Sequence, residues 1–249
     1  MRNVRVLLSA MQLACSVFCF GQVKMHLEDI SPKESPVHVS GDTFFNDDAS
    51  QRIRFSYRIE GSVANVSNRG LLLIVVHFTS SGLKGPGLDY SYQKDYFFSS
   101  DVLEPGRIEA FHSSSLRFGM PTVNGKPIPE DSNISSTPVV AAQVMFVQFV
   151  DGSTWGEVET GHEPLVVRNQ TAQELARLER VLGEQGNQAL KDEFSKSDTA
   201  LPCIGAMADH CKGKAASCLA DDLHSMIEAA RQHQADLSAK SASLDDLIR

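Results

Sequence analysis

The 249-residue chain lacks the features that mark several common protein classes. Its formal net charge is −8 and no block of basic residues lies in its interior, which argues against a nucleic-acid or anionic-membrane partner, because both attract clustered Lys and Arg. It has no Gly-x-Ser-x-Gly nucleophile setting, phosphate-binding loop, His-Glu-x-x-His motif, Gly-x-Gly-x-x-Gly motif or EF-hand loop. We therefore assign no catalytic and no cofactor-binding residues from the sequence, and we expect a protein that is not an enzyme.

The N-terminal segment has the layout of an export signal. Arg2 and Arg5 precede an uncharged, largely apolar run over residues 6–20, and Cys19 and Gly21 place small residues at the −3 and −1 positions of a cleavage site before Gln22. At about 15 residues the run is shorter than the ~20 that span a bilayer as a helix. We therefore expect a signal peptide over residues 1–21 and a secreted or periplasmic protein with no integral membrane span after cleavage. An uncleaved N-terminal anchor is the alternative.

Cysteine is scarce, and two of the five cysteines, Cys15 and Cys19, lie in the expected signal peptide. Leu13-Ala14-Cys15 resembles part of a lipobox, the motif for lipid attachment. That motif requires an aliphatic residue three positions before the cysteine, where this chain has Gln12. We therefore do not expect a lipid anchor at Cys15.

The remaining cysteines, Cys203, Cys211 and Cys218, all lie in the last fifth of the chain. An odd number in an exported protein predicts one disulfide and one spare thiol, or an intermolecular bridge. Residues seven apart on an unbroken helix lie about 10 Å apart along its axis, which is too far for a disulfide. A bond from Cys218 to either of the others therefore requires the chain to turn, plausibly at Gly213. The sequence leaves the pairing open.

Residues 22–168 are predicted to form an all-β domain. Residues 52–59 alternate between polar and apolar side chains, as in a strand with one buried and one solvated face, and residues 71–78 are a continuous apolar run, which indicates a central strand. We interpret residues 79–92 and 113–138 as loops, the second one as either a functional excursion or a hidden short hairpin. Seven to nine short strands without intervening helices favour an immunoglobulin/fibronectin-like antiparallel β-sandwich, with a closed barrel as the alternative.

The longest of these predicted strands covers residues 139–150. Asp151-Gly152 follows it, and Trp155, the one tryptophan of the chain, comes shortly afterwards. Because Asp-Gly favours tight hairpin turns, the pattern predicts a buried strand, a turn and a return strand. Residues 155–158 and 165–167 are expected to complete the set of strands.

At Asn169 the apolar period changes to that of a helix. Residues 171–174, Thr-Ala-Gln-Glu, form a capping box, and apolar residues at three-and-four spacing follow. Gly183 and Gly186 weaken this helix, and a second helical region is expected to begin near Pro202. Glycines 205 and 213 are expected to break it, before a third, frayed helix near the end of the chain. We therefore predict a helical C-terminal region over residues 169–249.

One family resemblance rests on the strands and turns of the β region. Its pattern is Gly61-Ser62-Val63-Ala64-Asn65, then an apolar strand ending at Phe78, then Leu103-Glu104-Pro105-Gly106, and finally the unit Val144 to Trp155. This pattern resembles the FxLYD-type family of bacterial extracellular immunoglobulin-like sandwiches, although Leu-Tyr-Asp is replaced by His77-Phe78-Thr79. The resemblance implies an extracytoplasmic interaction or structural module and supplies no catalytic residues.

The strongest candidate site joins the three C-terminal cysteines with His210 and His224. Cysteine and histidine are preferred zinc and copper ligands, but structural zinc sites use cysteine pairs two to four residues apart, whereas these lie eight and seven apart. We therefore favour a helical hairpin with one disulfide and assign no metal ligands. A second candidate, the aromatic residues of 90–98, is either a recognition patch or partly core.

The leading hypothesis is a non-catalytic binding or structural module of the periplasm or cell surface, acting on another protein or a cell-envelope component without a cofactor. The alternatives are a secreted metal-binding or thiol-redox protein that acts through the C-terminal helices, and a hydrolase with residues on the loops 79–92 and 113–138. The sequence fixes neither the ligand nor the oligomeric state.

Overall fold

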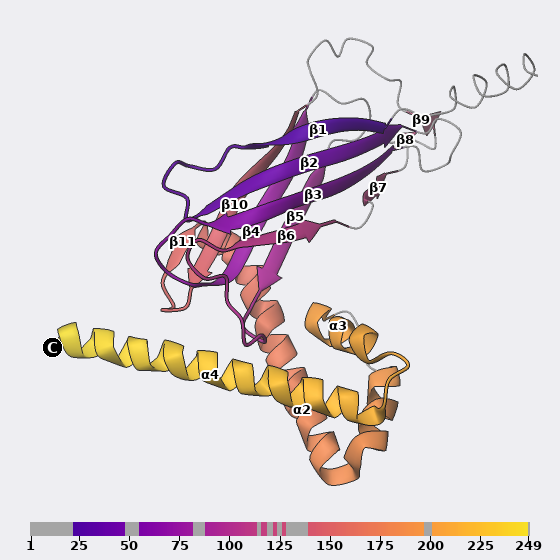
Figure 1. The fold of residues 1–249 in the computed structure, drawn as a ribbon, viewed down its shortest axis with the longest axis vertical. Helices are drawn as coiled ribbons and strands as arrows, with labels where there is room; N and C mark the ends of the chain where they lie inside the picture. The colour runs from indigo at the N-terminus through magenta and orange to yellow at the C-terminus, as the bar shows by residue number, and fades with distance from the viewer. Residues whose placement is uncertain are drawn as a thin grey trace, which may run out of the picture.

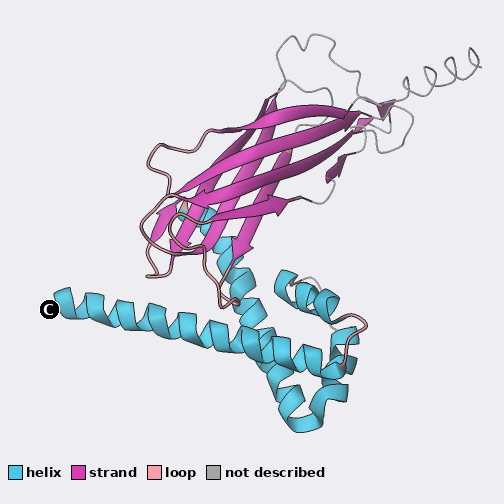
Figure 2. Cartoon of the chain, viewed as in Figure 1, coloured by secondary structure: helices cyan, strands magenta, loops and turns pink. Residues whose placement is uncertain are grey.

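The computed structural model describes the following residues of the chain: 22–47, 55–81, 88–113, 116–118, 122–123, 126–127, 139–196 and 201–248. The predicted signal peptide and Cys15 lie outside these ranges. The strands are β1 (Gln22–Asp29), β2 (Val37–Asp47), β3 (Phe55–Asn65), β4 (Leu71–Ser81), β5 (Asp89–Asp95), β6 (Ile108–His112), β7 (Leu116–Phe118), β8 (Thr122–Val123), β9 (Lys126–Pro127), β10 (Val139–Phe149) and β11 (Thr154–Gly156). The helices are α2 (Val158–Lys196), α3 (Pro202–Cys211) and α4 (Ala216–Ile248). Strands and helices lie in separate parts of the molecule (Figures 1 and 2), and the predicted combination of a β region with C-terminal helices is confirmed.

The main sheet has the strand order β5-β4-β10-β1-β2-β3-β6, with β11 paired to β10 and β7 paired to β3. Strand β1 joins its two halves. Residues 22–26 pair antiparallel with β2, whereas residues 27–29 pair parallel with β10. The other strand pairs of this sheet are antiparallel, so the described sheet is mixed rather than purely antiparallel as predicted.

The sheet curls so that its two end strands face each other. The rings of Tyr92 on β5 and Phe111 on β6 lie 4.7 Å apart, and Phe111 also lies 5.7 Å from the ring of Phe78 on β4. Lys94 and Glu109 add an ion pair of 3.1 Å between the same two end strands. The curled sheet thereby encloses an apolar core to which both of its halves contribute.

Strand β4 is buried on both faces, as its continuous apolar run predicts. Ile74, Val76 and Phe78 face the core inside the curled sheet. Leu73 and Val75 face the other way and pack with Phe146 of β10 in a second cluster, which α2 covers with Leu165. The central strand is therefore apolar throughout because helix α2 occupies the outer face of the sheet at this point.

The predicted hairpin after residue 139 is confirmed, since β10 and β11 pair across a turn. The Phe149 N–H donates to the Ser153 carbonyl at 2.9 Å, and the Asp151 carboxylate accepts the Ser153 N–H at 3.0 Å. Arg69 forms an ion pair with Asp151 at 3.2 Å, and its guanidinium carbon lies 3.5 Å from the centre of the Phe149 ring. Trp155 packs, partly buried, against the core. Asp151 thus holds the turn between the two strands.

The first helix begins earlier than predicted. α2 starts at Val158, so the strand expected at residues 165–167 is wrong, and Thr171 of the expected capping box is buried inside the helix. The run Leu165-Val166-Val167 has strand-like composition, but its place is decided by tertiary contact, since Leu165 packs on the outer face of the sheet.

Two predictions around β5 are also wrong. The expected loop 79–92 is partly strand, because β4 continues to Ser81 and β5 begins at Asp89. The strand expected at residues 96–98 is a turn that follows β5. The Asp95 carboxylate holds this turn by accepting the Phe97 N–H at 3.0 Å.

Of the loop predicted at 113–138, the described part contains the β8–β9 pair, in agreement with the hidden-hairpin alternative.

The helices are longer than their glycines predict. Gly205 lies inside α3, so the break expected there is wrong, and α4 runs unbroken to Ile248 where a separate third helix was expected. The expected interruption of the first helix does occur at Gly186, where φ is +80° and ψ is −178°. In the described residues, no helix is both long and apolar enough to cross a membrane.

Candidate functional site

A buried ion pair fastens helix α2 to the sheet. The Arg168 guanidinium donates to both carboxylate oxygens of Asp95, from Nε at 2.8 Å and from Nη2 at 2.9 Å, and also to the Gln148 side-chain oxygen at 2.8 Å. Only 7% of the Arg168 side chain and 19% of the Asp95 side chain are exposed. The guanidinium also lies 4.6 Å from the centre of the Phe97 ring. This bidentate contact fixes the turn after β5 relative to the helices.

The turn after β5 inserts two aromatic side chains among the helices. Phe97 and Phe98 are buried, with ring centres 5.3 Å apart in an edge-to-face arrangement, and both belong to the apolar cluster formed by α2, α3 and α4. His233 of α4 also contacts the segment after β5, since its Nε2 atom lies 3.0 Å from the Ser99 carbonyl oxygen. These two members of the aromatic segment 90–98 are therefore core residues rather than an exposed patch.

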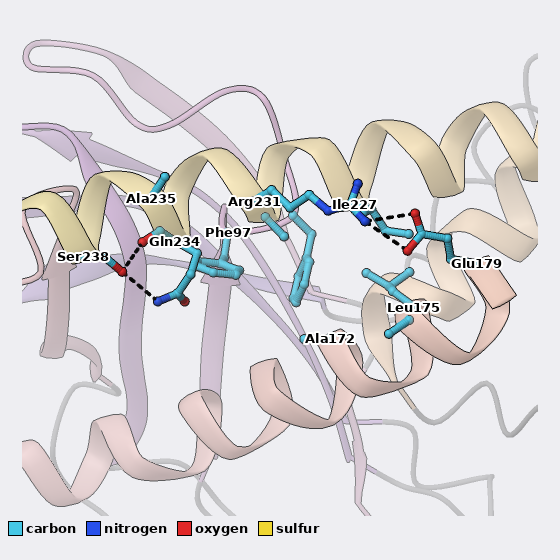
Figure 3. Close-up of a pocket in the computed structure, with 12 residues that line it drawn as sticks. Phe97, Ala172, Leu175, Glu179, Ile227, Arg231, Gln234, Ala235 and Ser238 are labelled. Atoms are coloured by element: carbon cyan, nitrogen blue, oxygen red, sulfur yellow. Dashed lines mark hydrogen bonds and ion pairs between the residues drawn. The ribbon is translucent and has the colours of Figure 1, made fainter.

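An apolar cleft opens above these phenylalanines, where α4 crosses α2 (Figure 3). Its volume is about 480 Å³. Among its apolar lining residues, the larger Phe97, Phe98, Leu175 and Ile227 are buried, whereas Ala172, Ala176 and Ala235 are exposed. The lining residues are Phe97, Phe98, Ala172, Leu175, Ala176, Glu179, Ile227, Ala230, Arg231, Gln234, Ala235 and Ser238.

Polar groups of this cleft gather at two places on its rim. Arg231 of α4 donates to both carboxylate oxygens of Glu179 of α2, at 3.0 and 3.1 Å, and its side chain is 69% exposed. One turn further along α4, Gln234 and Ser238 bond to each other, with the Ser238 hydroxyl donating to the Gln234 carbonyl at 2.8 Å. The arrangement of an apolar interior with a few polar rim groups is typical of small-molecule sites.

The C-terminal cysteines separate into a disulfide and a spare thiol. Cys211, at the end of α3, and Cys218, in the first turn of α4, are bonded, while Cys203 is free. Gly213 between the two helices has φ +75°, a conformation that favours glycine, and it lets the chain reverse within the eight-residue ring. The turn that the sequence places at Gly213 is therefore what brings these two cysteines together.

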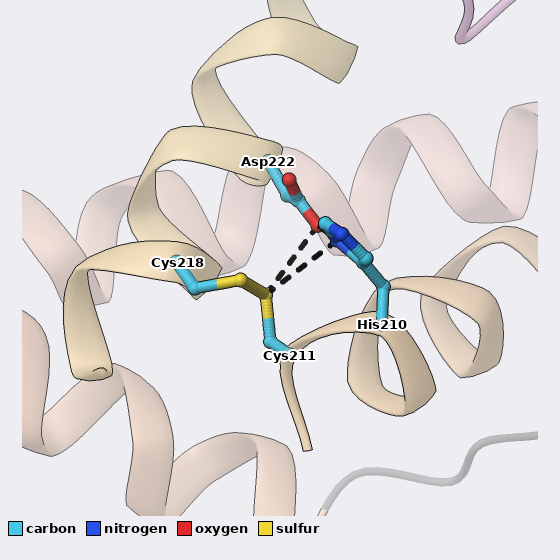
Figure 4. Close-up of side chains that lie close together, drawn as sticks. All are labelled: His210, Cys211, Cys218 and Asp222. Carbon is cyan, nitrogen blue, oxygen red and sulfur yellow. Dashed lines mark hydrogen bonds and ion pairs between the residues drawn. A yellow bond between two sulfur atoms is a disulfide. The ribbon is translucent and has the colours of Figure 1, made fainter. Parts of the chain in front are cut away.

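His210 and Asp222 lie beside the disulfide (Figure 4). The Nδ1 atom of His210 is 2.6 Å from Oδ2 of Asp222, and the Cys211 sulfur is 3.4 Å from the same oxygen and 4.0 Å from the same nitrogen. One donor atom from each of the four residues lies within 4.8 Å of every other. Cys203 and His224, which the sequence grouped with them, are not part of this cluster, and His224 is exposed.

Asp222 is the member of the cluster that sequence reasoning missed. It lies four residues after Cys218 on α4, a spacing that places two side chains on the same face of a helix. A search for carboxylates at this spacing from each cysteine would have found it.

A second, more polar cleft of about 450 Å³ lies between the end strands of the sheet and helices α3 and α4. Cys203, His210 and Asp222 line it from the helices, and Tyr96 and Glu109 line it from the sheet. The Tyr96 hydroxyl bonds to the Glu109 carboxylate, and burial, followed by this bond, raises the pKa of the tyrosine well above its ordinary value. Burial likewise raises the pKa of the Cys203 thiol. Both shifts disfavour the charged forms, and for cysteine the charged form is the nucleophilic thiolate.

The Ser113 side chain, at the start of the predicted loop 113–138, has a structural role. The Ser113 hydroxyl accepts the Ile59 N–H at 2.9 Å, and the Ser113 N–H donates to the Ile59 carbonyl at 2.9 Å, so this serine completes the sheet at the end of β6. Residues 82–87 and most of 113–138, on which the hydrolase alternative rests, lie outside the described residues.

Comparisons with protein-family models, with curated proteins and with solved structures find no match to this chain.

Proposed function

We propose that the protein is an exported, non-catalytic binding module of the periplasm or cell surface, and that it holds an acyl chain of a cell-envelope lipid in the cleft between α2 and α4. The observation that carries the proposal is the cleft itself. Its volume of about 480 Å³ falls in the range of small-molecule sites, and its interior is lined by phenylalanine, leucine, isoleucine and alanine.

The rim supports a ligand with one acidic end. Among the described residues Arg231 is paired with Glu179, and because the two side chains are 69% and 35% exposed, their ion pair contributes little, about 0–1 kcal/mol. An acidic head group can therefore take the place of Glu179 at little cost, while the chain of the ligand covers the apolar floor. Gln234, three residues further on the same face of α4, offers an additional hydrogen-bond donor.

The proposed location rests on two observations. The layout of residues 1–21 favours export, and the Cys211–Cys218 disulfide is the kind of bond that persists in oxidising compartments. We further propose that the curled sheet is an immunoglobulin-like sandwich scaffold of the FxLYD type. The division of β1 between the two halves of the sheet and the apolar core between these halves support that assignment.

Titration of the disulfide-bonded protein with a dansyl-labelled medium-chain fatty acid tests the proposal. We expect saturable enhancement of dansyl emission at one probe per chain. Replacing Ala176 by tryptophan fills the cleft and should weaken binding at least about tenfold, equivalent to ~1.4 kcal/mol. Gln173→Trp adds the same side chain at an exposed position of the same helix and should leave the affinity unchanged.

A second variant separates the head group from the chain. Arg231→Gln should weaken binding of the acidic probe but not of its uncharged methyl ester. Absence of saturable binding, or equal affinities for the Ala176→Trp and Gln173→Trp variants, would contradict the proposed site.

A further inference from the structure

We infer that His210, Cys211, Cys218 and Asp222 form a metal site that becomes available when the Cys211–Cys218 disulfide is reduced, with zinc as the metal that fits best. The inference goes beyond the proposed function, since none of these residues lines the apolar cleft. It rests on the convergence of four donor atoms from two helices at a single point (Figure 4).

The donor atoms lie close to the spacing of a tetrahedral site. With zinc–sulfur bonds of about 2.3 Å and zinc–nitrogen or zinc–oxygen bonds of about 2.0–2.1 Å, neighbouring ligands lie roughly 3.3–3.8 Å apart. The Cys211 sulfur lies 3.4 Å from the Asp222 oxygen and 4.0 Å from the His210 nitrogen. The His210–Asp222 contact of 2.6 Å is the hydrogen bond that an ion would replace, and the two atoms need to separate by less than about 1 Å.

The donor set is also the appropriate one chemically. Zinc is a borderline-soft ion that accepts thiolate, imidazole and carboxylate ligands in four-coordinate tetrahedral sites, and the cluster offers two cysteines, one histidine and one aspartate. His210 is adjacent to Cys211 at the end of α3, and Asp222 lies one turn after Cys218 on α4, so each helix supplies two ligands. His210 and Asp222 also line the polar cleft, which gives an ion access from solvent.

The disulfide controls whether this site exists. While the two sulfurs are bonded to each other, neither can act as a thiolate ligand. A dithiol reductant supplies two electrons and two protons, which break the sulfur–sulfur bond and give two thiols, and the reductant itself becomes a disulfide. Binding of Zn²⁺ then releases the two thiol protons. In the zinc-bound state the two sulfurs, no longer bonded to each other, would lie roughly 3.8 Å apart.

Cobalt(II) titration of the oxidised and the reduced protein tests the inference. The protein is reduced with a phosphine under anaerobic conditions, and the phosphine is removed before the titration. We expect the reduced protein to bind one Co²⁺ per chain, with thiolate-to-cobalt charge transfer in the near ultraviolet and the strong visible absorption of tetrahedral cobalt. Zn²⁺ should displace it. The oxidised protein should show neither band.

Substitutions assign the ligands. Asp222→Asn should lower the Co²⁺ affinity of the reduced protein at least about tenfold, whereas Asp221→Asn, at an exposed neighbouring position, should not change it. Cys203→Ser should leave both bands intact, because this thiol lies outside the cluster. Circular dichroism of the reduced apoprotein shows whether the helices persist.

Any of four results would overturn the inference. The first is equal Co²⁺ uptake in the two redox states, and the second is binding without a thiolate band. The third is equal affinity of the Asp222→Asn and Asp221→Asn variants. If reduction unfolds the helices, the inference requires Co²⁺ to restore both the helical signal and the bands, and failure to do so also overturns it.

Discussion

Replacing Arg168 by methionine should destabilise the protein strongly, because it removes one partner of a buried ion pair. The Asp95 carboxylate would lose two hydrogen bonds from the guanidinium group, and the Gln148 side-chain oxygen would lose one. Removing one partner of a buried pair costs about 3–5 kcal/mol, since the remaining charge stays desolvated and unpaired. Methionine preserves much of the side-chain volume, so the loss reports on charge and hydrogen bonding rather than on a cavity.

The matched control is Arg231→Met, which breaks the exposed pair with Glu179. The Arg231 side chain is 69% exposed and the Arg168 side chain only 7%, so the control should cost about 0–1 kcal/mol. Adding Asp95→Asn to Arg168→Met should recover part of the stability, because the double variant no longer buries an unpaired carboxylate.

Urea unfolding followed by two probes measures these effects. Far-ultraviolet circular dichroism reports mainly on the helices, while the fluorescence of Trp155 reports on the sheet. Because Arg168 fastens α2 to the sheet, we expect both transitions to shift together to lower urea. A loss below about 1 kcal/mol for Arg168→Met, or a shift of only one probe, would refute the reasoning.

Three further predictions concern glycines and the spare thiol. Gly186→Ala should lower the free energy of unfolding in urea by about 1–3 kcal/mol, because φ at this residue is +80°. The control Gly183→Ala lies within the regular helix and should raise it by about 0.5–1 kcal/mol. Equal effects of the two substitutions would contradict this prediction. Gly161→Ala should cost about 1–3 kcal/mol in the same assay, since the new Cβ would lie 2.5 Å from the buried Phe146 ring, and a neutral effect would argue against this packing. Because burial raises its pKa, Cys203 should react with iodoacetamide more slowly than free cysteine at pH 8, with the rate still rising above the ordinary thiol pKa, and a rate equal to that of free cysteine would contradict the assignment.

Individual strands of the β region could be predicted where the sequence of the strand itself shows that it is buried. The continuous apolar run of β4 and the long run of β10 followed by Asp151-Gly152 identify a central strand and a hairpin, and both are present. Such patterns record how many faces of a strand are buried. They do not record which strand lies alongside, so the parallel pairing of β1 with β10 left no signal in the sequence.

The start of α2 could not be predicted for a related reason. The run Leu165-Val166-Val167 favours a strand locally, yet these residues are helical because Leu165 packs against the outer face of β4 and β10. The contact partners lie roughly twenty and ninety residues away in the chain, and no local pattern contains them.

The candidate sites were predictable to different degrees. The turn at Gly213 and the clustering of cysteines are visible in the sequence, and they bring Cys211 and Cys218 together. The apolar cleft is not visible, because Phe97 and Phe98 resemble a strand in the sequence, whereas in the structure they form the floor of the cleft where the turn after β5 docks among the helices. A site built between distant elements is defined by their docking, which composition and periodicity do not encode.

Photo-crosslinking with a fatty acid that carries a diazirine on its acyl chain tests the central claim most directly. Digestion and mass spectrometry then locate the attached label. The account predicts labelling of peptides that contain Ala172 to Glu179 on α2 and Ile227 to Ser238 on α4, suppressed by excess unlabelled fatty acid and by Ala176→Trp. Labelling spread over the sheet, or labelling of these helices that neither competitor nor variant reduces, would contradict it.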